Sequence, residues 1–156
     1  MPSTDQTFTV GQVLTAAEMS QLPLGVLGIT RTTANVGPTS GTTELDVITA
    51  PAVTVGPTNR RLRISFHSKA VTGTVSGDAF TLRIKEGATI LAEYNILIPT
   101  STLQLACDFE TFVDSPTAGS HTYKVTIQQN AGTGTATVQA GSGAGTAIAV
   151  MDVGQV

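Results

Sequence analysis

Tryptophan is absent from the 156-residue sequence, aromatic residues make up 4% of it, and Cys107 is its single cysteine. Charged residues account for 12%, about half of the ~25% that is usual in soluble domains. So few charges argue against a coiled coil or a charged disordered chain. A single cysteine excludes an intrachain disulfide, which fits synthesis in a reducing compartment.

A basic surplus is also missing. Eight Lys and Arg residues stand against eleven Asp and Glu, whereas nucleic-acid-binding domains usually carry clustered positive charge. The uncharged stretch 125–151 is interrupted by amides, glycines and threonines, so it does not read as an apolar spanning helix. The first five residues lack the basic and apolar regions of a signal peptide. We therefore expect no nucleic-acid partner, no membrane span and no secretion signal.

The abundant residues favour β-structure. The chain contains 27 Thr, a β-branched residue that prefers strands, and 16 Gly, which is common in turns. Apolar and polar residues alternate over 61–67, 80–85, 103–110 and 122–127, with turn signals between these stretches. This pattern predicts an all-β protein, an antiparallel β-sandwich or jelly roll of eight or nine strands. The expected core residues are Leu62, Ile64, Phe66, Phe80, Leu82, Ile84, Leu105, Phe109, Val125 and Ile127.

The first 25 residues differ from the remainder. Thr15 and Glu18 have the spacing of a capping box, and a short helix is expected from Thr15 until Pro23 ends it. Two turns of helix are marginal alone, so this segment needs a surface on which to dock. The sequence predicts an N-terminal anchoring arm over residues 1–25 and a β-sandwich domain over 26–156. The arm residues expected to bind a partner are Phe8, Val10, Val13, Leu14, Met19 and Leu22.

Charged side chains cluster at three places. Three cations lie within four residues, and two carboxylate pairs have i, i+2 spacing on one face of an expected strand. Such carboxylate pairs occur in glycosidase and calcium sites, and a basic cluster can contact phosphate. Without aromatic platforms or a basic surplus, ion pairing within the chain or across a subunit boundary is favoured. The residues concerned are Arg60, Arg61, Arg63, Glu44, Asp46, Asp108 and Glu110.

No constellation for catalysis or cofactor binding is present. His67 and His121, expected to be partly exposed, lack the spacing of metal ligands, and no G-x-S-x-G elbow occurs. The glycine-rich segments 132–134 and 141–145 complete no phosphate-binding motif and predict hairpin turns. We expect no enzyme activity, no cofactor and no metal. The sparsely charged surface indicates coverage by other subunits, since the centres of protein interfaces are depleted in charge.

Residues 8–22, FTVGQVLTAAEMSQL, resemble an opening segment of tailed-bacteriophage structural proteins that reads roughly F-x-x-G-x-x-L-T-A. Residues 148–154, IAVMDVG, are similar to the final strand of such phage domains. Ser20 departs from the pattern, in which Asn is commoner. The resemblance implies a homotrimeric jelly-roll virion protein, assembled in the host cytoplasm and binding the major capsid protein or another virion protein. A capsid decoration protein is favoured, and a tail-tip or fibre adhesin that binds host surface glycan is the alternative.

Overall fold

The computed structural model describes residues 23–56, 59–141 and 145–156. Within these residues the chain is β-structure without helix, and no segment could cross a membrane as a helix. The predicted all-β antiparallel class is confirmed, while most of the predicted arm and its helix lie outside the described residues. The strands are β1 (Gly25–Thr32), β2 (Val36–Thr39), β3 (Leu45–Thr49), β4 (Val53–Val55), β5 (Arg60–Gly73), β6 (Ala79–Glu86), β7 (Thr89–Leu97), β8 (Gln104–Asp114), β9 (Gly119–His121), β10 (Tyr123–Ala131), β11 (Ala136–Gln139) and β12 (Thr146–Gln155).

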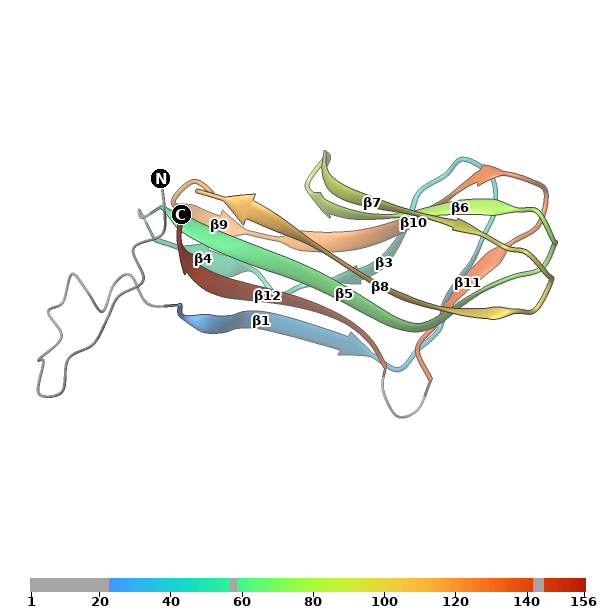
Figure 1. The fold of residues 1–156 in the computed structure, drawn as a ribbon, viewed down its shortest axis with the longest axis horizontal. Coiled ribbons are helices and arrows are strands. Elements are labelled where there is room, and N and C mark those ends of the chain that lie inside the picture. The colour runs from blue at the N-terminus through green and yellow to red at the C-terminus, as the bar shows by residue number, and fades with distance from the viewer. Residues whose placement is uncertain (1–22, 57–58, 142–144) are drawn as a thin grey trace, which may run out of the picture.

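Two antiparallel sheets form the layers of the sandwich (Figure 1). The larger sheet has the order β1-β12-β5-β11-β2, with β8 paired along the other side of β5. The smaller sheet has the order β3-β10-β6-β7, and β4 pairs with β9 near the C-terminus. The fourteen-residue β5 connects the larger sheet, because its first part pairs with β12 and its last four residues pair with β11. Twelve strands are described where eight or nine were expected, since several, such as β2, β4 and β9, are very short.

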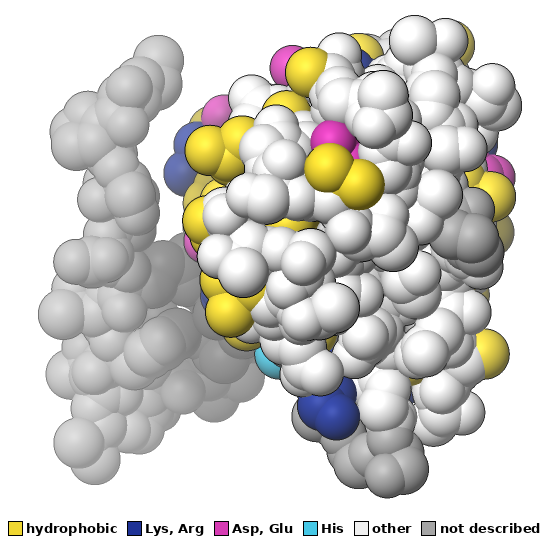
Figure 2. All heavy atoms as spheres, turned by 90° about the vertical axis from the view of Figure 1, so that its right-hand side faces the viewer, with side chains coloured by type: hydrophobic (Ala, Val, Ile, Leu, Met, Phe, Trp, Pro, Cys, Tyr) yellow, Lys and Arg dark blue, Asp and Glu magenta, His cyan; other side chains and the backbone are white. Residues whose placement is uncertain are grey.

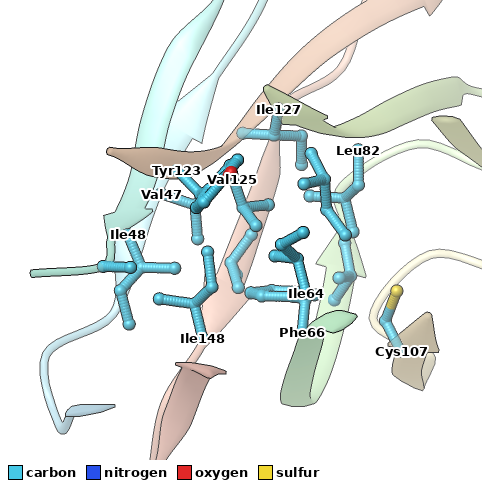
Figure 3. Packing of buried hydrophobic residues seen from close by; sticks show 14 of the residues in the cluster. Val47, Ile48, Ile64, Phe66, Leu82, Cys107, Tyr123, Val125, Ile127 and Ile148 are labelled. Carbon is cyan, nitrogen blue, oxygen red and sulfur yellow. The ribbon is translucent and has the colours of Figure 1, made fainter. Parts of the chain in front are cut away.

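Apolar side chains from the inner faces of the two sheets meet in one core. Figure 3 shows Ile64, Phe66 and Ile148 from the larger sheet close to Leu82 and Val125 from the smaller sheet. The residues that the alternation predicted to face the core therefore do face it. The buried members of the expected core are Leu62, Ile64, Phe66, Phe80, Leu82, Ile84, Val125 and Ile127.

The prediction of burial is wrong in degree for Leu105 and Phe109. Both point inward and pack against the core, but both are only partly buried. They belong to β8, which pairs with β5 alone and lies at the edge of the larger sheet. A side chain at a sheet edge is covered from fewer directions, so the correct phase does not ensure full burial.

The outer face of the smaller sheet is covered by its own polar side chains. Thr81, expected to face solvent, is only 2% exposed, and its hydroxyl donates to Asn95 Oδ1 at 2.5 Å. The Asn130 amide in turn donates to Thr81 Oγ1. Thr126 is likewise buried and donates to Glu44 Oε1 at 3.2 Å. Cross-strand hydrogen bonding thus removes these hydroxyls from water without placing them in the core.

Candidate functional site

The outer face of the larger sheet carries three cross-strand rows in register. Opposite residues in antiparallel strands point to the same side of a sheet, so each row contributes four side chains to one surface. We call this surface the four-strand surface. In the order β1, β12, β5, β8, its rows are Arg31-Ala147-His67-Asp108, Ile29-Ala149-Ser65-Glu110 and Val26-Met151-Arg63-Phe112.

Small side chains at the middle of the four-strand surface leave an open depression of about 400 Å³. Ala147 and Ala149 of β12 line one side of it, and Ser65 lies beside them on β5. The pairs His67–Asp108 and Arg63–Glu110 line the side towards β8. The depression thus combines a low floor, which admits a group from a partner, with charged hydrogen-bonding groups along one side.

Ion pairs between β5 and β8 hold these charged groups in place. Arg63 Nε donates to Glu110 Oε2 at 2.6 Å, and His67 Nδ1 lies 2.5 Å from Asp108 Oδ1. Arg61 binds Asp114 through two hydrogen bonds, of 2.5 and 2.9 Å, which hold the pKa of Asp114 below its ordinary value. All these side chains remain substantially exposed, so each pair adds little stability. Their main effect is to orient donors and acceptors on the surface.

Exposed apolar side chains accompany the ion pairs. Phe112 is 51% exposed, and the Arg61 guanidinium lies 5.7 Å from the centre of its ring. Val26 and Ile29 on β1 are exposed as well, and Met151 is partly exposed between the strands. Aromatic residues, Met and Arg are enriched where proteins bind one another, and Lys is depleted. The cations of the four-strand surface are Arg and His without Lys, whereas its Ser, Ala, Asp and Glu residues are types that such interfaces contain less often.

The described residues of the four-strand surface form no nucleophile–base pair and no metal-binding group. Ser65 and His67 lie side by side on β5, but no hydrogen bond joins them in the described structure. An activated serine needs its base within hydrogen-bond distance. The described residues also contain no group of three His, Cys, Asp or Glu side chains that could hold a metal ion. The arrangement can bind a partner through shape, charge and apolar contact.

Six of the seven charged residues singled out in the sequence have an oppositely charged partner in the same chain, and Asp108 pairs with His67, which is charged only when protonated. The three arginines form no common basic patch, because Arg60 points inward while Arg61 and Arg63 point outward. Contacts of these residues across a subunit boundary stay a prediction, and the six arm residues lie outside the described residues. The pairs are Arg60–Asp152, Arg61–Asp114, Arg63–Glu110, Asp108–His67, Asp46–Lys124 and Glu44 with both Arg83 and Lys85.

Glu44 belongs to a closed polar network on the smaller sheet. It accepts hydrogen bonds from Lys85 Nζ at 2.5 Å and from Arg83 Nη1 at 2.9 Å. The Lys85 hydrogen bond, together with those from Arg83 and Thr126, lowers the pKa of Glu44 although burial opposes the shift. Arg83 also binds Glu93 at 2.6 Å. Glu44, Arg83 and Lys85 thus satisfy one another, and their side chains are less exposed than those of the ion pairs on the four-strand surface.

The glycine-rich turn 132–134 connects β10 to β11 and has its amide groups occupied. Asp78, which is 2% exposed, accepts hydrogen bonds from the backbone N–H of Gly134 at 2.8 Å and of Thr133 at 3.2 Å. The carboxylate takes the place that an anionic ligand would need. The turn is therefore structural, but the predicted hairpin is wrong, because β10 belongs to the smaller sheet and β11 to the larger one. Residues 142–144 of the second glycine-rich segment lie outside the described residues.

His121 is buried, in contrast to the partial exposure expected for it. Its Nδ1 lies 2.6 Å from Glu86 Oε1, and its Nε2 lies 2.7 Å from the carbonyl oxygen of Thr117. Both partners accept only, so the ring donates from both nitrogens in its protonated form. Burial lowers the pKa of His121, but the hydrogen bonds to Thr117 and Glu86 outweigh it, and the net shift is upward. His121 thus connects the short β9 to the end of β6 and has no open side for a ligand.

Figure 2 shows the end of the molecule that lies at the right in Figure 1. Its surface is mainly backbone and uncharged polar side chains, with isolated hydrophobic and charged side chains. This view agrees with the sparse charge of the sequence.

No protein-family model matches the sequence, and no curated protein matches it. Among solved structures, the chain is similar to a carbohydrate-binding module, CBM6cm-2, of lichenase 5A from Cellvibrio mixtus, determined in complex with cellotriose. The identity is 18%, the TM-score is 0.36, and the match covers 81% of this chain and 97% of the module. The likeness concerns the β-rich fold alone.

Proposed function

We propose that the chain is a non-enzymatic structural protein of a tailed-bacteriophage virion, a homotrimeric capsid decoration protein that binds the major capsid protein or another virion protein. The observation that carries a binding role is the four-strand surface, where oriented ion pairs line a depression and exposed apolar side chains lie on the same face. Exposed apolar patches of this kind mark interaction sites. The resemblance of residues 8–22 to phage structural proteins supports the assignment to a virion.

The depression explains how such a surface would hold a partner. Ala147 and Ala149 leave room for a protruding side chain or a close approach of backbone. Arg63 and Asp108 are held by their partners before binding, at 2.6 and 2.5 Å, so less side-chain entropy is lost on association. The exposed ring of Phe112 adds apolar area beside them. Shape and preorganised charge would together provide specificity.

A substitution that fills the depression tests this role. Ala149→Trp places a large ring on its floor, and we expect binding to virus particles that lack the protein to fall at least tenfold. Ala88→Trp makes the same change at an exposed turn between β6 and β7 and should bind as the wild type does. Both variants should unfold at the wild-type denaturant concentration. Wild-type binding by Ala149→Trp would show that the depression is not the contact.

Glycan binding is the second candidate, favoured by the polar groups that line the same depression. Ser65, Arg63 and Glu110 could form hydrogen bonds with sugar hydroxyls there. Phe66 and Phe109 also line the depression, but both side chains point inward to the core, so the described surface presents there no exposed aromatic platform of the kind that sugar sites commonly use. A glycan array with wild type and Ala149→Trp separates the candidates. Glycan binding that Ala149→Trp abolishes, without binding to the capsid, would support an adhesin.

A further inference from the structure

The four-strand surface ends in two free strand edges. In the described structure β1 pairs only with β12, and β8 pairs only with β5. Each therefore presents a row of backbone N–H and C=O groups along its outer side, over eight residues in β1 and eleven in β8. A free edge of this length is a template for pairing with another strand.

The directions of the two edge strands suit each other. All three pairings between β1 and β8 are antiparallel, so β1 runs opposite to β8. A second copy rotated about an axis parallel to the strands keeps these directions. Its β1 would then meet β8 of the first copy as an antiparallel neighbour and continue the alternation of the sheet.

The levels of the side chains also match. In a closed ring, each copy is related to the next by a rotation about the ring axis, with no shift along that axis. Residues of one cross-strand row therefore stay at the same height along the strands in neighbouring copies. Arg31 of one copy would face Asp108 of the next, and Val26 would face Phe112. Opposite charges and aromatic with β-branched side chains are favourable cross-strand pairs.

The charges are available for such a contact. Arg31 is exposed and takes part in no ion pair in the described part of the chain. Asp108 has a side chain that is 64% exposed, and its partner His67 is charged only when protonated. Exposed Arg31 on one edge and exposed Asp108 on the other are complementary.

We propose that copies of this chain join edge to edge, with β1 of one copy pairing antiparallel with β8 of the next and Arg31 facing Asp108, to close a ring of three. This inference rests on the homotrimer of the proposed function and identifies its contact. The outer faces of the three larger sheets would then form one continuous surface. The alternative is that the acidic side chains of β8 prevent its edge from pairing with another strand.

A charge swap tests the contact through the native mass, measured by light scattering at micromolar concentration. The wild type should have three times the 16.0 kDa mass of the chain. Arg31→Glu and Asp108→Arg each place like charges together and should weaken assembly about tenfold or more. The double variant Arg31→Glu/Asp108→Arg should restore it. Lys69→Glu makes the same charge change as Arg31→Glu at an exposed β5 residue that forms no ion pair with the described residues, and it should leave the mass unchanged.

Three results would overturn the proposal. They are a monomeric wild type, single variants that keep the wild-type mass, and a double variant that stays dissociated. Hydrogen exchange gives an independent readout, because outer-edge amides of β1 and β8 should be protected in the wild type and exchange faster in Arg31→Glu. Binding to particles is measured separately. A monomer that still binds would overturn the ring while leaving the role in the virion intact.

Discussion

Arg60 and Asp152 form a buried bidentate ion pair between the first residue of β5 and the end of β12. Arg60 Nε donates to Asp152 Oδ2 at 2.7 Å and Nη2 donates to Oδ1 at 2.5 Å, with both side chains less than 5% exposed. Asp152 also accepts from the backbone N–H of Gly154 at 2.8 Å. The pair borders a cavity of about 220 Å³ beside Leu24, where the described chain begins to form β1.

Removing one member of this pair should be strongly destabilising. We expect Asp152→Ala to lower the free energy of unfolding by about 3–5 kcal/mol, because it removes the carboxylate that binds the buried Arg60 guanidinium through two hydrogen bonds. Asp114→Ala, at the exposed pair with Arg61, is the control and should cost less than about 1 kcal/mol. Denaturant unfolding measures both. Equal losses would show that burial does not distinguish the two pairs.

His121 should make stability depend on pH. Its folded pKa is raised, so its stabilisation is complete below the unfolded pKa of about 6.5 and is lost as pH rises through the folded pKa. His121→Gln should therefore destabilise the protein more at about pH 5.5 than at about pH 8.5. Glu86→Gln should reduce the same pH dependence, because the Glu86 carboxylate helps to raise the pKa of His121. Unfolding at the two pH values gives the answer, and an unchanged profile in His121→Gln would contradict it.

Two phenylalanines of the predicted core should differ in their contribution. Phe80 is fully buried, so Phe80→Ala should cost about 3–5 kcal/mol. Phe109 is partly buried at the sheet edge and stacks on the exposed ring of Tyr94, with 5.6 Å between the ring centres, so Phe109→Ala should cost roughly half as much. Denaturant titration of both variants checks the order. A larger loss for Phe109→Ala would mean that the β8 edge is covered in solution.

Cys107 should be unreactive in the folded protein. Burial, with a smaller effect of Asp108, raises the pKa of its thiol to about 12. The reactive thiolate is then roughly 10⁻⁴ of the total at pH 8. Iodoacetamide should label Cys107 readily in denaturant and at a rate limited by opening under native conditions. Equal labelling rates in both states would contradict the burial of this thiol.

The strand class and the facing of the central strands could be predicted from the sequence. Phe80, Leu82 and Ile84 alternate with polar residues, and this period of two is a local property of an extended backbone. The glycines at 132–134 indicated a chain reversal there, but not that it crosses from the smaller sheet to the larger one. The polar network around Glu44 could not be predicted in this way. Alternation indicates that Arg83 and Lys85 point outward, but it does not indicate which strand lies beside them.

The sequence by itself determined that this chain is β-structured, sparsely charged and built on alternating apolar residues. Only the tertiary structure decided that Arg63 binds Glu110 and that Ala149 lines a depression over β12, β5 and β8. It also decided that Phe109 lies at an edge and that Thr81 is buried. Alternation follows from local backbone geometry, whereas register, edge position and burial depend on which distant strands pair, and that pairing is settled by the packing of the whole sandwich.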